Sequence, residues 1–476
     1  QFLHVTKDDG VTWETISPDL TAFESDKQVI SGSPITRDIT GEEFYSAIYS
    51  VRESPLKKGL IWVGSNDGPV HVTYDGGKNW KDVTPNKNIK GGRVDSVEPS
   101  SHNSSKAFVT ILRYQLGDWR PYIYRTYNNG NSWDLITEGI PADYPVRVLR
   151  EDPKREGLLF AGTEFGMFIS FDDGNNWQSF QKNLPITPIT DIKIHRNDVV
   201  LSTMGRSFWI LDNINYLRSF SFNDDDFLYP VSNTIRYRNR PSNSNHVTYP
   251  RTSVDFDYKI TNKSVGEILI TIMDDENNLI NSFKSINKNQ NIENYEMSTN
   301  EFTFISNSNI SKKIGVNRFK WDMRHRGSWN KNSRFSYRNG PMAKPGQYKV
   351  ILTIDGRSFT ENFEIISDPR IKDVSPEVYD EQEKVLLEIR DFMTDVRLFE
   401  DKVSKMLEKK PENKNLNSIK DHLVTKKGTY MKPMLIDQIR YLQSMLSRAD
   451  QKLGKDALIR LKELKSEFNI LKKKLG

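Results

Sequence analysis

Five carboxylates stand in polar segments between apolar, β-type runs, where they could act as general acids, bases or nucleophiles. They are Asp38, Glu43, Asp67, Asp118 and Glu164. Two carboxylates that flank a glycosidic bond can hydrolyse it, with retention of configuration when they lie about 5–5.5 Å apart and inversion at about 6.5–9.5 Å. The sequence therefore offers candidate catalytic residues for a glycoside hydrolase, without fixing which two would form the pair.

Arginine and aromatic residues accompany these carboxylates. The candidate ligand-binding residues are Arg37, Arg113, Tyr114, Trp119, Arg120 and Arg206. Aromatic faces can stack on pyranose rings, and guanidinium and carboxylate groups hydrogen-bond to hydroxyl groups. Such a surface suits a sugar or an extended peptide.

A motif of the form Ser/Thr-x-Asp-x-Gly-x-x-Trp occurs four times and identifies the elements that position these side chains. Its defining residues are Asp8, Gly10 and Trp13; Asp75, Gly77 and Trp80; Asn128, Gly130 and Trp133; and Asp172, Gly174 and Trp177. The Gly tolerates positive φ, the Asp or Asn accepts hydrogen bonds from turn amides, and the Trp begins the next strand. We predict a hairpin turn with structural aspartates, because the pattern lacks the oxygen ligands and closing Glu of a calcium loop.

The spacing of the motif predicts the architecture. The motif tryptophans are 67, 53 and 44 residues apart, and the shortest interval suits one four-stranded propeller blade. The predicted strands are 44–53, 60–65, 69–74 and 80–84; 93–98, 106–113, 121–127 and 133–137; 146–151, 158–163, 167–171 and 177–180; and, without the motif, 189–195, 199–203 and 207–211.

Blade topology places the candidate residues together. In an up-and-down blade, the loops between strands 2 and 3 and the connections from strand 4 to the next strand 1 share one face. The motif turns, between strands 3 and 4, lie on the other. All the candidate catalytic and ligand-binding residues fall in the first set, so we expect them near the mouth of the propeller.

The motif is the Asp box of bacterial neuraminidase-type (BNR) repeats, and residues 1–220 resemble the propeller of bacterial sortilin-like proteins often labelled glycosyl hydrolases. Segments 61–80, 120–124 and 205–212 carry the resemblance. The remainder of the chain matches the same family's C-terminal layout. The resemblance implies the C-terminal portion of a longer family member. Receptor biology of the sortilin kind is not implied, because its cysteine-rich module has no counterpart here.

The first motif follows a single strand, so the first blade lacks its inner strands. An open sheet edge invites pairing with other strands. We therefore expect the missing N-terminal blades on the same polypeptide or on a partner chain.

Composition narrows the classes of function. The absence of Cys excludes disulfides and thiol chemistry, and none of the seven His pairs at helical spacing, so no metal and no cofactor is predicted. No apolar run approaches the length of a transmembrane helix. The 23 Lys and Arg and 18 Asp and Glu of residues 371–476 account for the whole net charge of +5. We interpret that excess as a solvated helix face and predict no nucleic-acid partner.

Two further domains are predicted after the propeller at 1–220. Residues 221–370 alternate with period two and indicate an antiparallel, immunoglobulin-like β-sandwich, entered through polar linkers at 223–226 and 236–245. Residues 371–476 indicate a helical hairpin or three-helix bundle, with helices over 376–407, 433–449 and 455–475 and loops at 409–417 and 424–431. The expected fold class is mainly β: a partial propeller, a sandwich and a C-terminal helical region.

Three functions remain open at this point. The first is a binding or scaffold propeller, secreted or in the bacterial cell envelope (periplasm or outer-membrane surface), which recognises glycan or protein at its mouth. The second is a glycoside hydrolase that uses two carboxylates of the same face. The third is an accessory subunit of an envelope assembly. The fold does not choose among them, because function resides in the site.

Overall fold

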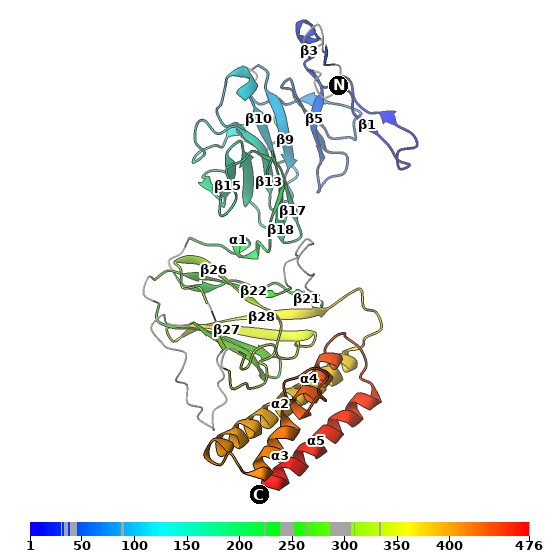
Figure 1. Ribbon diagram of the computed structural model, residues 1–476. Coiled ribbons are helices and arrows are strands. Elements are labelled where there is room, and N and C mark those ends of the chain that lie inside the picture. Colours follow the sequence, from blue (N-terminus) through cyan, green and yellow to red (C-terminus); the bar gives the residue numbers. More distant parts are fainter. Residues whose placement is uncertain are drawn as a thin grey trace. The chain divides into compact units, whose positions relative to one another are not determined.

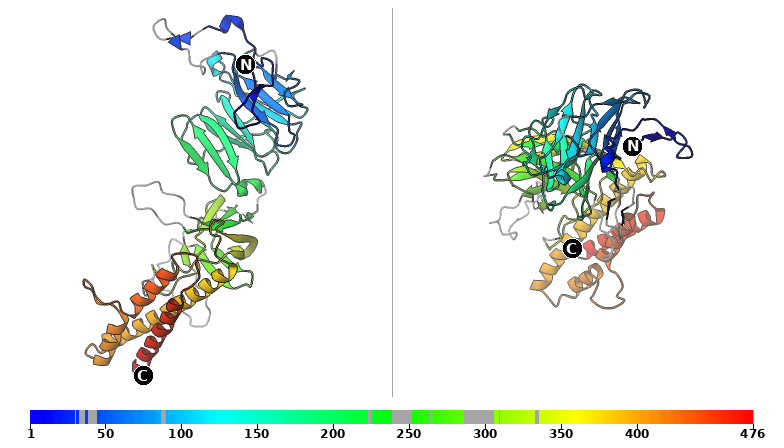
Figure 2. Two further views of the ribbon diagram at one scale, coloured as in Figure 1. Left: turned by 90° about the vertical axis from the view of Figure 1, so that its right-hand side faces the viewer. Right: turned by 90° about the horizontal axis from the view of Figure 1, so that it is seen from above.

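The computed structural model describes residues 1–29, 31–32, 37–38, 45–86, 90–222, 225–238, 252–262, 265–285, 306–308, 310–332 and 335–475. The chain divides into two compact units, Gln1–Arg218 and Ser219–Gly476. The fold is mainly β, with propeller blades in the first unit and a helical region at the C-terminal end of the second (Figures 1 and 2).

The first unit is a series of antiparallel meanders, each with its strands in sequence order. The first three blades consist of β5 (Ile48–Glu53), β6 (Ile61–Ser65), β7 (Val70–Thr73) and β8 (Lys81–Asp82); β9 (Arg93–Pro99), β10 (Ala107–Leu112), β11 (Ile123–Thr126) and β12 (Asp134–Leu135); and β13 (Val146–Glu151), β14 (Leu159–Thr163), β15 (Gly166–Ser170) and β16 (Gln178–Ser179). The fourth blade has three strands, β17 (Ile189–His195), β18 (Asp198–Thr203) and β19 (Phe208–Leu211). These four sheets match the strands predicted from the motif spacing.

Short elements flank the four blades. Before them stand β1 (His4–Val5), which pairs with β2 (Glu14–Thr15), the 3-10 helix η1 (Ser25–Lys27), and β3 (Ser31–Gly32), which pairs with β4 (Arg37–Asp38). After them comes the short helix α1 (Asn215–Arg218). The hairpin β1–β2 holds the first motif.

Neighbouring blades pack through their inner strands β5, β9, β13 and β17 (Figure 1). Apolar clusters fill the space between the first three sheets, and the second strands β10 and β14 are fully buried because they have a sheet on each side. Glycine permits this approach: a Cβ on Gly162 would lie 2.7 Å from Ile189 of the next blade. Any larger residue there would push the blades apart.

The second unit begins with two β-sheets around one apolar core. The smaller sheet has the order β20 (Phe227–Leu228), β22 (Val254–Ile260), β26 (Gly315–Trp321). The larger has the order β21 (Thr234–Arg236), β28 (Arg357–Ser367), β27 (Gly346–Ile354), β23 (Ile268–Asp274), β24 (Leu279–Ser285), β25 (Ser306–Ser308). The pairs β21–β28 and β24–β25 are parallel, so the prediction of a purely antiparallel sandwich was wrong.

The predicted linkers also need correction. Asp226 is buried and accepts hydrogen bonds from the backbone N–H and hydroxyl of Thr261 at 2.8 and 2.9 Å. Arg236 ends strand β21 and is buried, and the Arg238 Nε donates to Asp450 at 2.9 Å. These residues anchor the chain, while 223–224 and 239–245 lie outside the described residues.

Four helices follow: α2 (Pro376–Lys409), α3 (Lys414–Leu423), α4 (Leu435–Leu446) and α5 (Lys455–Leu475). Helix α3 begins inside the predicted loop 409–417, because the Asn413 side chain caps it by accepting from the Leu416 N–H at 3.1 Å. The helices share one apolar core. None of the helices in the described part of the chain is apolar over a length that would cross a membrane.

Candidate functional site

The inner strands of all four blades carry a β-bulge at the same register. The bulged residues are Tyr49, Asp95, Arg147 and Thr190. Each directly follows a residue that pairs with the last or second-to-last residue of strand 2. A bulge redirects its side chain and locally interrupts pairing. We call these four residues the bulge row. They lie near the strand ends from which the 2-to-3 loops depart, which we call the loop end; the opposite end, with the motif turns, is the motif end.

Charged contacts join the bulge row across three blades. The Nε and Nη2 groups of Arg93 both donate to the Asp95 carboxylate, and Arg147 reaches Asp95 at 3.9 Å and Glu164 at 2.5 Å. The Arg93 guanidinium lies 4.4 Å from the centroid of the Tyr49 ring. Burial raises the pKa of the Asp95 carboxyl, and its pairing with Arg93 opposes that shift. The cluster is thus a chain of compensated charges that ends in a half-exposed aromatic ring.

The longest 2-to-3 loop, residues 113–122, stands beside this row, and we call it the arm. Asp118 holds it together: its carboxylate accepts from Arg120 Nε and Nη2 at 2.9 Å, from the Tyr122 hydroxyl at 2.7 Å and from Arg113 Nε at 3.2 Å. Hydrogen bonds from Arg120, then Tyr122 and Arg113, hold the pKa of Asp118 well below its usual range. Arg113 also donates to the carbonyl of Gly91. The arm is therefore fixed both internally and to the neighbouring connection.

The arm presents aromatic surface. The rings of Tyr114 and Trp119 lie 5.6 Å apart, and the guanidinium of Arg147 lies 5.9 Å from the Tyr114 ring. Trp119 is 47% exposed and Leu116 57% exposed. A loop held by hydrogen bonds thus joins the exposed Trp119 and the half-buried Tyr114 to the charged bulge row.

The structure distributes the predicted catalytic residues among different roles. Glu164 joins the bulge row through Arg147, and Asp118 braces the arm. Asp67 is buried and accepts from the backbone N–H of Ala22 at 2.9 Å and of Phe23 at 3.2 Å, so its carboxylate anchors the N-terminal segment. Asp38 lies in β4, where its side chain is outside the described residues, and Glu43 is outside them altogether.

The predicted ligand-binding residues divide similarly. Arg113, Tyr114, Trp119 and Arg120 all belong to the arm. Arg206 lies in the β18–β19 loop, and its backbone carbonyl accepts from the Trp209 indole N–H at 2.9 Å. Arg37 lies in β4, and its side chain is outside the described residues.

Sequence reasoning missed the centre of the site, which is formed by Tyr49, Arg93 and Asp95. These residues lie within inner strands, whereas the candidate residues were predicted from the loops and connections between strands. The available signal was an acid or base interrupting an apolar strand, as in Arg93-Val94-Asp95 and Val146-Arg147-Val148. The bulges themselves follow from strand pairing, which the sequence does not display.

The motif turns at the other end are closed structures. In the second copy, the Asp75 carboxylate accepts from the Asn79 backbone N–H at 3.0 Å and its side-chain amide at 2.8 Å, and the Thr73 hydroxyl donates to it at 2.8 Å. These bonds lower the pKa of Asp75 to about 2. The glycines of all four copies have positive φ. Each aspartate or asparagine is thus used by its own turn.

Three of the motif tryptophans form hydrogen bonds to the preceding repeat. Their indole N–H groups donate to backbone carbonyls as follows: Trp80 to Ile16 at 2.9 Å, Trp133 to Val83 at 2.8 Å and Trp177 to Ile136 at 2.9 Å. The motif therefore fixes the spacing between repeats through Trp80, Trp133 and Trp177, whereas Trp13 of the first copy is 63% exposed.

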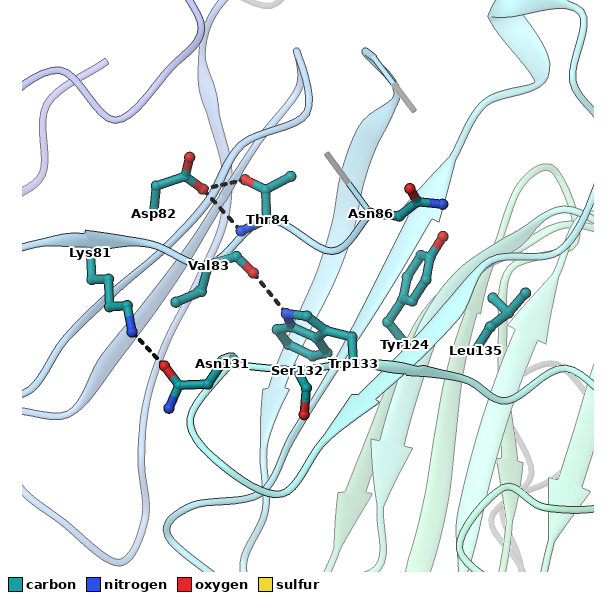
Figure 3. Close-up of a pocket in the computed structure, with 11 residues that line it drawn as sticks. Lys81, Asp82, Val83, Thr84, Asn86, Tyr124, Asn131, Ser132, Trp133 and Leu135 are labelled. Atoms are coloured by element: carbon teal, nitrogen blue, oxygen red, sulfur yellow. Dashed lines mark hydrogen bonds between the residues drawn. The ribbon is translucent and has the colours of Figure 1, made fainter. Parts of the chain in front are cut away.

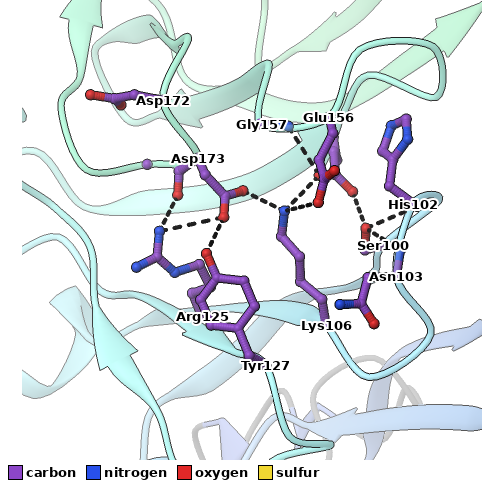
Figure 4. Close-up of polar contacts among 12 residues, drawn as sticks. Ser100, His102, Asn103, Lys106, Arg125, Tyr127, Glu156, Gly157, Asp172 and Asp173 are labelled. Carbon is purple, nitrogen blue, oxygen red and sulfur yellow. Dashed lines mark hydrogen bonds and ion pairs between the residues drawn. The ribbon is translucent and has the colours of Figure 1, made fainter.

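A second charge cluster surrounds Lys106 at the motif end (Figure 4). Its amine lies 3.0 Å from Glu151, 2.5 Å from Asp173 and 3.7 Å from Glu156, and its side chain is 1% exposed. Although burial alone would lower the pKa of Lys106, hydrogen bonding to Asp173 and the charge of Glu151 raise it above its usual value. The figure shows the amine enclosed by these groups, and we interpret the cluster as structural.

A pocket of about 610 Å³ lies on the outer strands of the first two blades (Figure 3). Trp133, Tyr124 and Asn86 line it, and the Trp133 indole is held by Val83. No bulge-row or arm residue lines this pocket. Among the described residues, no group of three or more His, Asp or Glu is arranged to hold a metal ion.

Comparison with known proteins gives distant similarities. No family model matches the chain. An oligoxyloglucan-reducing end-specific xyloglucanase from Emericella nidulans is 21% identical over 246 residues, which are 45% of this chain and 29% of that protein. The chain thus spans less than a third of this relative. The similarity is to a glycoside hydrolase, and the specific resemblance to sortilin-like proteins stays a prediction.

Comparison with solved structures gives matches with low TM-scores. A Niastella koreensis GH74 enzyme has a TM-score of 0.31 at 11% identity, covering 67% of this chain and 47% of that one. The GH74 xyloglucanase of Xanthomonas campestris has a TM-score of 0.28 at 13% identity, covering 44% and 34%. YCF48 bound to a D1 peptide has a TM-score of 0.28 at 14% identity, covering 45% and 63%.

Proposed function

We propose that the first unit binds a glycan at its loop end, with the aromatic pair Tyr114–Trp119 as the stacking platform. The observation that carries this proposal is that Asp118 braces the loop holding the exposed Trp119 and the half-buried Tyr114, since a preorganised surface loses little entropy on binding. The similarity to a xyloglucanase supports a glycan as the ligand class.

The charge balance of the site supports a ligand recognised by its hydroxyl groups. Arg93 and Arg147 are paired with Asp95 and Glu164, and both arginines of the arm are paired with Asp118. The guanidinium groups keep further N–H donors, and Glu164 keeps acceptor positions, for hydrogen bonds to sugar hydroxyls. Such a compensated set offers directional contacts without a strong net field.

Affinity electrophoresis in gels that contain xyloglucan, mixed-linkage glucan, xylan or mannan tests the proposal. We expect at least one glycan to retard the full chain, and Trp119→Ala to weaken that retardation about tenfold, which corresponds to about 1.4 kcal/mol. Trp13→Ala is the matched control, because Trp13 is also exposed but lies at the motif end. Absence of retardation by every glycan, or equal losses in both variants, would reject the proposal.

Hydrolysis is the second candidate, and one observation favours it. Asp95 and Glu164 flank the same guanidinium, and burial raises the pKa of Asp95, as a general acid requires. Release of reducing ends from the retained glycan measures this activity. Asp95→Asn and Glu164→Gln should each abolish it; no release by the unmodified chain from any glycan in the panel would remove this candidate.

We also propose that the protein is secreted or located in the cell envelope, because this is where it would encounter polymeric glycans such as those of the test panel. The absence of Cys is compatible with that location. Cell fractionation followed by immunodetection of the native protein measures it. Recovery in the cytoplasmic fraction alone would contradict this part of the proposal.

A further inference from the structure

The first three blades share a fourth strand that closes the outer edge of each sheet. At equivalent positions, a backbone N–H of the fourth-strand segment donates to a carbonyl of the third strand: Val83 to Val70 at 2.8 Å, Ile136 to Ile123 at 2.9 Å and Phe180 to Met167 at 2.8 Å. The donor residue is apolar in all three. The two preceding residues form the short strands β8, β12 and β16.

The fourth blade lacks this strand, and the motif is not repeated after β19, where Leu211, Asn215 and Arg218 stand at the Ser/Thr, Gly and Trp positions. The strand registers align Leu211 with the hydroxyl residues that open the motif turns, Thr73, Thr126 and Ser170. In those turns, the hydroxyl bonds to both the Asp or Asn and the Gly N–H, as between Thr126 and Gly130 at 2.9 Å. Leucine can make neither bond, so the chain does not turn back along β19.

The chain instead enters α1 and is held to the third blade. The Arg218 guanidinium binds Asp152 at 2.8 Å, and the Arg155 side chain donates to the carbonyl of Leu217. Tyr216 and Leu217 are buried. Because this segment is tied down, it cannot supply the missing strand to β19.

Strand β19 is therefore an edge strand among the described residues. Phe208 is 77% exposed and Ile210 is 60% exposed. The strand, Phe208-Trp209-Ile210-Leu211, contains none of the Lys, Pro or bulge features that usually protect an edge from pairing. By register, Phe208 occupies the position of Val70, Ile123 and Met167, whose carbonyls bind a fourth strand.

We infer that β19 is a docking edge for an extended segment of a partner polypeptide, which adds antiparallel to β19 as the fourth strand of this blade. The repeated fourth strands define its chemistry: two residues that pair with Ile210 and Trp209, followed by an apolar residue whose N–H donates to the Phe208 carbonyl. Main-chain hydrogen bonds supply the affinity in such strand addition. This site lies apart from the glycan platform and does not depend on it.

Proline provides a selective test, because hydrogen-bonded pairs alternate along an antiparallel ladder. The N–H of Ile210 points in the same direction as the Phe208 carbonyl, toward the missing strand. Ile210→Pro removes that donor while leaving the pairing with β18, and proline is tolerated at such edge positions. Ile210→Thr is the matched control, since it keeps the N–H and a β-branched side chain.

The probe is a fluorescein-labelled peptide that copies residues 176–182, the fourth-strand segment of the third blade. We expect saturable binding to the full chain by fluorescence anisotropy, retained by Ile210→Thr and weakened at least tenfold by Ile210→Pro. Amide hydrogen exchange should show Ile210 exchanging fast in the free chain and slowly with peptide. Absence of saturable binding, equal affinities of the two variants, or a protected Ile210 amide in the free chain would each overturn the inference.

Discussion

Two charge clusters occupy opposite ends of the same blades, and they differ in what they leave open. At the motif end, Lys106 is enclosed by Glu151, Asp173 and Glu156 and is 1% exposed. At the loop end, Arg147 joins Asp95 to Glu164 beside the exposed aromatic arm. Both clusters tie neighbouring blades together. Buried ion pairs alone therefore do not identify a binding site, whereas accessible surface beside them does.

The largest expected effect is the loss of stability when the Lys106 charge is removed. Lys106→Met leaves Glu151 and Asp173 without their shared cation, and breaking a buried pair in this way costs about 3–5 kcal/mol. Urea unfolding of the full chain, followed by tryptophan fluorescence, measures it. Lys7→Met is the control, because the Lys7–Glu14 pair is exposed and is worth under about 1 kcal/mol. Equal stability of the two variants would show that the Lys106 cluster does not hold the blades.

Removal of the Arg147 charge should cost less stability and more function. In Arg147→Met, Asp95 keeps Arg93, and Glu164 retains some access to water, so we expect a loss of about 1–3 kcal/mol. Glycan retardation should fall at least tenfold. Arg206→Met serves as the control at the same end, because the contact described for Arg206 is made by its backbone carbonyl. Unchanged glycan affinity in Arg147→Met would separate the bulge row from the binding site.

Local sequence signals predicted much of the fold. Strand β13 was predicted at 146–151, where it is observed, and the motif predicted each turn between the third and fourth strands. Helix α5 was predicted at 455–475, where it is observed. What local signals could not provide is pairing between distant segments: β21 lies parallel to β28, more than 120 residues away in the chain. Helix α3 was missed because a side-chain cap at Asn413, rather than periodicity, sets its start.

The candidate site was predicted only at its rim. Topology predicted Trp119 and Glu164 at the loop end, and there Trp119 is exposed and Glu164 binds Arg147. The sequence could not indicate that Asp67 would be consumed by backbone amides forty-four and forty-five residues away. It also could not indicate Asp95, whose position depends on a bulge in the pairing of β9 with β10.

Replacement of the two exposed tryptophans should have a smaller effect on stability than the changes above, in contrast to replacement of a buried motif tryptophan. Neither Trp119 nor Trp13 is deeply buried, so replacement of either by Ala should change the free energy of unfolding by less than about 0.5 kcal/mol. Trp177→Ala, which removes a buried ring and its bond to Ile136, should cost about 3–5 kcal/mol. Urea unfolding of the three variants provides the comparison. A large loss in Trp119→Ala would mean that the arm is structural.

The smallest effect concerns the acid side of the stability profile, and it arises at the motif end. The pKa of Asp75 is about 2, below its usual value near 4, because Asn79 and Thr73 donate to its charged form. A carboxylate whose pKa is lowered by folding stabilises the folded state at pH values above its unfolded pKa. This contribution is lost as pH falls from about 4 to 2. Asp75→Asn should therefore flatten the fall in stability over that interval.

The third motif copy supplies the reverse experiment, because it already carries Asn128 in the same hydrogen-bonding position. Its side-chain oxygen accepts from the Ser132 N–H at 2.9 Å, while its amide donates to the Ser132 hydroxyl at 2.8 Å. That hydroxyl can instead donate to a carboxylate, so Asn128→Asp should steepen the same pH interval that Asp75→Asn flattens. Urea midpoints between pH 2 and 5 measure both slopes. Slopes that change in the same direction would show that the turn carboxylates do not govern acid stability.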